Sequence, residues 1–261
     1  MKNTITYFIC TLFLFVACQK EIDVELNDAA PKLVIEANLV ATDSIVKVKV
    51  TKTASYFDQY TTNYINDAIV VIKNQQGVET IVPHIADGYY ELSNYATEIG
   101  TVYTVTVTHE GTAYSSTCKL MPTLELLPAR IEYQEPSIFS EEGYWIYYSF
   151  QDFQGVGNCY KMIPTYHGKT YDKFGDFSLG EDKFTDGNIV ERPLMKTLQL
   201  GDTVWLELQS IDKKVYDYYD QLGSNTSSFT ASAGNPNYVW TNDALGYFSA
   251  YTYVKQQIIV E

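Results

Sequence analysis

The stretch Thr101-Val102-Tyr103-Thr104-Val105-Thr106-Val107-Thr108-His109 decides the fold of this chain. Its side chains alternate strictly: one face carries Tyr103, Val105 and Val107, and the other carries Thr104, Thr106 and Thr108. A period of two is the signature of a β-strand with one buried face. We therefore predict a strand over 101–109, a turn at Glu110-Gly111 and a return strand over 112–120.

The same pattern extends through the first half of the chain. Asn74-Gln75-Gln76-Gly77 and Asp87-Gly88 are turn signals between short apolar runs. Further strands are predicted over 33–40, 44–53, 68–72 and 78–82. Many short strands without helical periodicity predict an antiparallel β-sandwich of immunoglobulin-like or transthyretin-like type over residues 32–122.

The second half, residues 123–261, is predicted to be a separate β-rich domain, either a sandwich or an open barrel. Met121-Pro122 and Pro128 mark the boundary, because proline cannot donate to a strand ladder. Strands are predicted over 144–150, 158–166, 203–210, 246–253 and 256–260. The fold class expected for the whole chain is therefore all-β.

One segment of the second half, 211–222, is predicted to be a helix. Its apolar and aromatic residues lie on a single helical stripe, Ser210 is the expected N-cap, and Gly223 follows the last turn. The Ser/Thr/Asn/Gly-rich stretch 223–235 is expected to be a mobile loop.

The composition excludes some classes of function. The chain has 261 residues with 18 Lys+Arg against 32 Asp+Glu, a formal charge of −14. No net positive field is available to neutralise phosphates, so nucleic-acid binding is not expected. Tyrosine, with 23 residues, outnumbers glycine, with 15, which favours half-buried strand positions and aromatic surfaces.

The N-terminus predicts export and lipidation. Lys2 precedes the apolar run 5–17, which is too short to span a bilayer and fits a signal peptide over residues 1–17. The run ends at Ala17-Cys18, which resembles a bacterial lipobox, so Cys18 is the expected lipidation site and 18–31 the lipidated tether. The alternative is an ordinary secretory cleavage site with an incidental cysteine.

The charged residues that follow, Gln19-Lys20-Glu21-Ile22-Asp23, resemble a surface-export signal of Bacteroidetes lipoproteins. The expected location is the outer membrane, on the cell surface, with the chain held by covalent lipid such as palmitate. Cys118 and Cys159 remain in the exported chain. The sequence is consistent with either a disulfide between them or two buried free thiols.

Chemistry-bearing motifs are sparse. The sequence contains no hydrolase, zinc-protease or phosphate-loop motif, so no catalytic residues and no enzyme activity are expected. Metal ligands are not expected either, with one weak exception for calcium. Asp182, Asp186 and Gly187 match three positions of the calcium-loop template, although Phe184 does not fit and the final Glu is missing.

An aromatic cluster near the C-terminus offers a possible binding surface. Tyrosine and tryptophan are enriched at interfaces because they combine an apolar ring with a hydrogen-bonding group. Alternate residues of a sandwich strand face the core, so part of the cluster must be structural. The candidate surface consists of Tyr238, Trp240, Tyr247, Phe248 and Tyr251.

The order of motifs resembles a Bacteroidetes lipoprotein family catalogued as domain of unknown function 4249. The resemblance rests on Cys18, Pro31-Lys32-Leu33-Val34-Ile35-Glu36-Ala37, Asp87-Gly88-Tyr89-Tyr90, Phe150-Gln151-Asp152 and Gly246-Tyr247-Phe248-Ser249-Ala250-Tyr251. It implies a surface lipoprotein of the outer membrane that acts as a non-catalytic binding or accessory partner of a TonB-dependent transporter, contacting the receptor barrel. The alternative is a structural or assembly component of an envelope complex without a small ligand.

Overall fold

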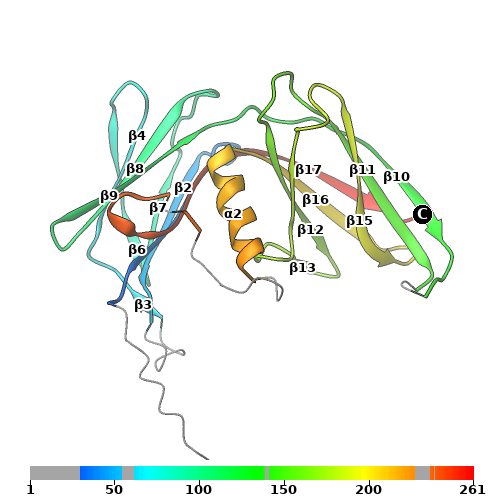
Figure 1. The fold of residues 1–261 in the computed structure, drawn as a ribbon, viewed down its shortest axis with the longest axis horizontal. Coiled ribbons are helices and arrows are strands. Elements are labelled where there is room, and N and C mark those ends of the chain that lie inside the picture. The colour runs from blue at the N-terminus through cyan, green and yellow to red at the C-terminus, as the bar shows by residue number, and fades with distance from the viewer. Residues whose placement is uncertain (1–29, 55–61, 139–140, 227–235, 238) are drawn as a thin grey trace, which may run out of the picture. The chain divides into compact units, whose positions relative to one another are not determined.

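The computed structural model describes residues 30–54, 62–138, 141–226, 236–237 and 239–261. Residues 31–261 form one compact unit made of three β-sheets, the helix α2 (Lys213–Thr226) and the short 3-10 helix η2 (Thr241–Asp243) (Figure 1). Among the described residues, no helix is both long and apolar enough to cross a membrane.

The large sheet has ten strands. Its spatial order is β13 (Lys169–Thr170), β12 (Cys159–Tyr166), β16 (Thr203–Ile211), β17 (Leu245–Ile259), β1 (Leu33–Val40), β2 (Ile45–Lys52), β7 (Tyr89–Ser93) and β6 (His84–Ala86), with β14 (Ser178–Glu181) beside β12 and β3 (Asn63–Tyr64) beside β2. A four-stranded sheet has the order β5 (Glu79–Val82), β4 (Ile69–Lys73), β8 (Val102–His109) and β9 (Thr112–Lys119). A three-stranded sheet has the order β10 (Leu126–Gln134), β11 (Gly143–Gln151) and β15 (Ile189–Leu198).

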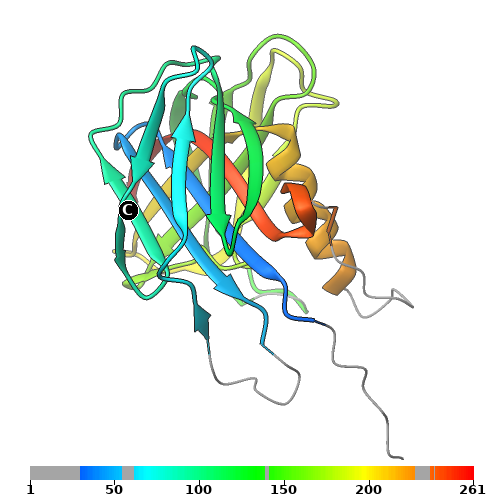
Figure 2. The ribbon, with the colours of Figure 1, turned by 90° about the vertical axis from the view of Figure 1, so that its left-hand side faces the viewer.

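Both small sheets pack on the same face of the large sheet. The first core joins the four-stranded sheet to β1, β2 and part of β17, and Figure 2 shows these two layers one behind the other. The second core joins the three-stranded sheet to β12, β16 and the end of β17. Phe248 lies in the first core and Ile258 in the second. Phe248 and Ile258 are ten residues apart on β17. Because successive side chains of a strand point to opposite faces, these two point to the same face of the sheet.

The 15 residues of β17 therefore run past both cores. Along its first half β17 pairs with β1 in parallel, from Val34↔Leu245 to Val40↔Tyr251, and on its other side it pairs antiparallel with β16. Gly246 makes the parallel pairing possible. Its φ is +100°, and a Cβ placed there would lie 2.1 Å from the carbonyl oxygen of Ile35.

The all-β fold is confirmed, and the domain division needs one correction. The chain changes from the first core to the second between Leu120 and Leu124, close to the expected boundary. However, the segment 240–250 returns to the first core, where Trp240, Phe248 and Ala250 are buried. Residues 32–122 are therefore not a sandwich closed on itself, because its large sheet is completed by the C-terminal strand.

Several elements differ from the sequence prediction. Pro128 lies inside β10, where the register shifts between Leu127 and Arg130, and Pro193 lies in β15. Both strands are edges of the three-stranded sheet, which is where proline is tolerated. The two predicted strands 246–253 and 256–260 are one strand, β17.

The helix begins two residues later than predicted, because Ile211 is the last residue of β16. Its N-terminus is capped by Asp212, whose Oδ1 accepts a hydrogen bond from the backbone N of Lys214 at 2.8 Å. Gly223 lies within the helix rather than beyond it, and 227–235 fall outside the described residues. Cys118 and Cys159 are both buried free thiols.

Candidate functional site: a groove on the open face of the large sheet

The face of the large sheet opposite the two small sheets, which we call the open face, carries a line of tyrosines. Helix α2 covers part of this face, and its Tyr219 contacts Tyr247. On β17, the core positions Phe248 and Ala250 alternate with Tyr247 and Tyr251, which are half-buried on the open face. Tyr253 continues the same row. A strand with aromatic residues on its solvent side presents rings and hydroxyl groups to whatever approaches the sheet.

These tyrosines line a groove of about 340 Å³, which we call the tyrosine groove. Neighbouring strands and α2 contribute polar walls. Besides the three tyrosines, the residues that matter for its chemistry are Asn38, Asp43, Lys47, Lys161, Asp172, Glu207, Gln209, Tyr219 and Lys255. The volume falls within the range of small-molecule sites.

Hydrogen bonds and ion pairs fix most of the polar groups of the groove. Lys255 Nζ lies 3.0 Å from Glu207 Oε2, and Gln209 Nε2 donates to Glu207 Oε1 at 2.6 Å. The hydroxyl of Tyr253 donates to Asp43 Oδ1 at 2.6 Å. Because these side chains hold one another, the groove is ordered before any ligand arrives, which lowers the entropic cost of binding.

The amino group of Lys161 is held differently. Its Nζ lies 4.2 Å from the ring centroid of Phe177 and 4.8 Å from that of Tyr219. No carboxylate of the described chain forms an ion pair with it. Burial lowers the pKa of Lys161 to about 8, partly offset by the charges of Glu207 and Asp172. The groove therefore contains a positive charge stabilised by aromatic rings.

The tyrosines of the groove stay protonated at neutral pH. Burial raises the pKa of Tyr251, and the nearby charge of Glu207 adds to the effect. The hydrogen bond to Asp43, together with burial, raises the pKa of Tyr253 to about 12. Their hydroxyl groups are therefore available as neutral donors and acceptors, as suits recognition of a polar ligand.

The structure separates the residues of the sequence-predicted aromatic surface. Tyr247 and Tyr251 line the tyrosine groove. Trp240 and Phe248 do not, because they are 3% and 1% exposed in the first core, where Trp240 Nε1 donates to the carbonyl of Ile35 at 3.1 Å. Tyr238 lies outside the described residues, as does Cys18.

The structure also brings the weak calcium candidates together. Carboxylate oxygens of Asp182, Asp186 and Asp152 lie within 4.8 Å of one another, and Asp182 and Asp152 are buried. Burial raises the pKa of Asp152, and the charge of Asp182 adds to the shift. Asp152 was not among the predicted ligands.

Hydrogen-bond donors already occupy these carboxylates. Calcium needs six to eight oxygen ligands with free lone pairs. Five donor groups point at the three side chains: the backbone N of Gly155, Gly157 and Gly187, Nδ2 of Asn158 and the hydroxyl of Tyr160. The arrangement fits a clamp that ties the turn 152–158 to the turn 182–188, and it does not fit a calcium site without displacing these donors.

Sequence reasoning missed Lys161 and Asp152. Lys161 lies between Tyr160 and Met162, which are buried in the second core, so the alternation places it on the open face. That signal was present in the sequence, but the rings that cover the amino group come from residues 16 and 58 positions away. Asp152 follows the strand β11, and only the fold shows which turn it faces.

Comparison with solved structures gives matches of low identity and low TM-score. A segment of two fibronectin type-III domains from chicken tenascin is 10% identical, with 88% of this chain and 98% of that chain covered and a TM-score of 0.25. A cytokine receptor complex is 7% identical, with coverage of 87% and 96% and a TM-score of 0.28.

A search of curated proteins finds no match. A family model described as "Domain of unknown function (DUF4249)" matches residues 19–257. That range includes every strand of the described structure up to the last two residues of β17 and all residues named in the tyrosine groove. The chain therefore belongs to the DUF4249 family.

Proposed function

We propose that this protein is a lipid-anchored, surface-exposed protein of the bacterial outer membrane. In this proposal it binds a ligand without catalysis and works beside a TonB-dependent transporter. The observation that carries the binding role is the tyrosine groove, which combines tyrosine rings, fixed polar groups and the ring-covered charge of Lys161. Concave sites with a few convergent polar groups are the usual form of a small-molecule site.

The state of the acidic groups supports binding rather than acid–base chemistry. Glu207 is held by Lys255 and Gln209, and Asp43 accepts a hydrogen bond from Tyr253. A general acid or base must be free to exchange a proton with the reacting group. The anchor in this proposal is lipid on Cys18, followed by the tether 18–31.

The transporter partnership is tested by affinity capture of the full chain from outer membranes. We expect a receptor barrel to be recovered with the wild-type chain, and less of it with Tyr251→Ala. The control is Tyr133→Ala, because Tyr133 is 48% exposed on β10 and lies outside the groove. Recovery of envelope proteins without any receptor barrel would contradict the partnership and favour an assembly role.

The anchor is tested separately by labelling cells with radioactive palmitate. Label should enter the wild-type chain and be absent from Cys18→Ala. Equal labelling of the two chains would refute lipidation at this residue. Protease treatment of whole cells then reports whether the chain is displayed on the surface.

A further inference from the structure

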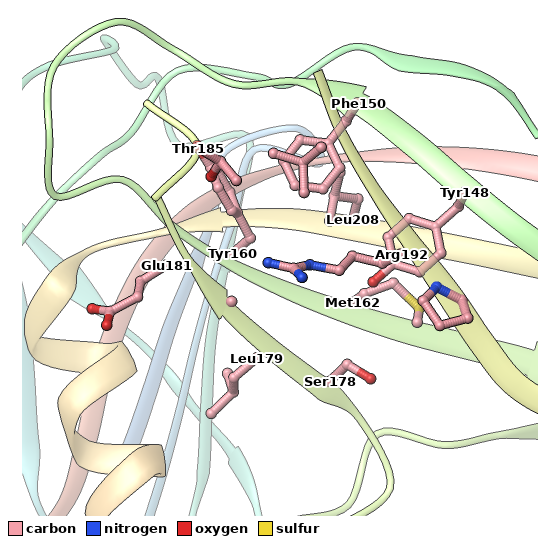
Figure 3. Close-up of a pocket in the computed structure, with 13 residues that line it drawn as sticks. Tyr148, Phe150, Tyr160, Met162, Ser178, Leu179, Glu181, Thr185, Arg192 and Leu208 are labelled. Carbon is pink, nitrogen blue, oxygen red and sulfur yellow. The ribbon is translucent and has the colours of Figure 1, made fainter. Parts of the chain in front are cut away.

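A second cavity lies at the edge of the second core, on the other face of the large sheet from the tyrosine groove (Figure 3). Strands β11 and β15 form one wall, and β12, β14 and β16 form the other. Its volume is about 190 Å³. Most of its surface is apolar and comes from Phe150, Tyr160, Met162, Val190 and Leu208. An engineered apolar cavity of about 150 Å³ in another protein binds benzene, so one ring or a short alkyl chain fits here.

The apolar wall is interrupted by the guanidinium of Arg192. On β15, Val190 and Leu194 are each 4% exposed in the second core, whereas Arg192, which has the same parity, is exposed and lines the edge of the pocket. Its cross-strand partner is Tyr148, which is buried in that core. Figure 3 shows the side chain of Arg192 reaching into the pocket. A guanidinium at the edge of a pocket is available to a ligand carboxylate when no carboxylate of the protein already pairs with it.

Arg192 has no such partner in the described chain. The protein has two arginines, and the other, Arg130, forms ion pairs with Glu132 and with Glu191, the latter at 2.6 Å. No described carboxylate is paired with Arg192. Glu181, which also lines the pocket, is paired with Lys213 at 3.6 Å. The pocket therefore combines an apolar lining with an exposed arginine that has no carboxylate partner in the described chain and that cannot lose its charge by deprotonation.

Hydroxyl groups add hydrogen-bonding capacity to the same lining. Thr185 Oγ1 is buried and has no hydrogen-bond partner among the residues that the structure describes. Tyr148 contributes a phenol that stays protonated, because burial raises its pKa to about 12. A buried hydroxyl without a partner carries a desolvation cost that a ligand oxygen would relieve.

We propose that this pocket binds a small carboxylate with an apolar body of one ring or a short alkyl chain, such as benzoate or hexanoate. The carboxylate pairs with Arg192, whose planar guanidinium matches two carboxylate oxygens. The apolar body lies against Phe150, Met162 and Leu208. This site is independent of the proposed role of the tyrosine groove.

The test compares acids with neutral molecules of the same shape. Hexanoate and benzoate, with 1-hexanol and benzyl alcohol as their neutral counterparts, are titrated into the full chain by calorimetry and ligand-observed NMR. We expect the acids to bind and to bind more tightly than the alcohols. Arg192→Gln should weaken acid binding about tenfold or more and leave the alcohols unchanged.

Two further variants serve as controls. Arg192→Lys should keep the preference for acids in part, and Arg130→Gln should leave every affinity unchanged because Arg130 is not part of the pocket. Arg192 is exposed, so its replacement should leave the thermal unfolding midpoint close to that of wild type. Equal acid affinity in wild type and Arg192→Gln, or no binding of either acid to wild type at millimolar concentration, would overturn the proposal.

Discussion

At the scale of single residues, the titration of Lys161 links the stability of the folded chain to pH. Its pKa is about 8 in the folded chain, against an ordinary value of 10.5. The folded state therefore binds fewer protons than the unfolded state between these values. Deprotonation of Lys161 therefore stabilises the folded chain. This stabilisation is fully present above pH 10.5 and is lost as the pH falls through about 8.

We therefore predict that the stability of wild type rises relative to Lys161→Met between pH 7 and pH 9.5. Replacing the charged group by a side chain of similar length should also stabilise the protein at pH 7, where Lys161 bears its buried charge. Urea unfolding of both chains at the two pH values measures the difference, in which the titration of the tyrosines cancels. Lys47→Met is the matched control, because Lys47 is exposed and paired with Glu91. Parallel pH profiles of wild type and Lys161→Met would contradict the prediction.

The carboxylate clamp formed by Asp152, Asp182 and Asp186 predicts insensitivity to metal removal. Because its oxygens accept hydrogen bonds from both turns, EDTA should leave the unfolding midpoint unchanged, and added calcium should not raise it. Asp182→Asn, in contrast, should destabilise the chain by about 1–3 kcal/mol, since it turns an acceptor of the Gly157 N–H bond into a group that also donates. A midpoint that falls on chelation would instead establish a bound cation.

At the scale of elements, Gly246 is the position on which the β1–β17 pairing depends. A Cβ there would meet the Ile35 carbonyl at 2.1 Å, so the parallel strands would have to separate. We predict that Gly246→Ala destabilises the protein by about 2–4 kcal/mol. Gly201→Ala is the control: its φ is +88°, but nothing lies within 4 Å of the added Cβ, so only about 1 kcal/mol of backbone strain is expected. Similar losses in the two variants, measured by urea unfolding, would refute the role of the close contact.

The elements that the sequence predicted well are those with uninterrupted alternation. The run Thr101–His109 gave β8 almost to the residue, since its valines and threonines separate the two faces without ambiguity. Pro128 was predicted to interrupt the sheet but lies within β10, because an edge strand tolerates proline and nothing in the local sequence identifies an edge. The pairing of β1 with β17 joins residues about two hundred positions apart, so no local pattern contains it.

The candidate site was predictable only in part, for the same reason. The predicted surface grouped Phe248 with Tyr247 because both are aromatic. In β17 the odd-numbered residues, which include Tyr247, Ser249 and Lys255, lie on the open face. Arg192 carried a similar signal, because it shares its parity with the buried Val190. Which of these side chains has an acidic partner depends on strands that are distant in the sequence, and it becomes visible only in the fold.

At the scale of the whole molecule, β17 joins two cores that the sequence assigned to separate domains. It supplies Phe248 and Ala250 to the first core and Ile258 to the second, and the chain just before it supplies Trp240. It is also the neighbour of β1 and of β16 in the large sheet. The two cores therefore share a central element, and loss of that strand exposes both.

Because both cores share this strand, we predict that the unit 31–261 unfolds in a single cooperative transition, with tyrosine fluorescence and far-ultraviolet circular dichroism giving the same midpoint.

The shared strand also predicts that a fragment ending at residue 122 does not fold, because β1 would lose its parallel partner and the first core would lose its C-terminal aromatic residues. The reason is energetic: burying a large apolar side chain contributes about 1.5–3 kcal/mol, so Trp240 and Phe248 together contribute about 3–6 kcal/mol. That sum is comparable to the lower end of the net stability of a small domain, about 5–15 kcal/mol. Two separate transitions in the full chain, or a folded 31–122 fragment, would show that the cores are independent.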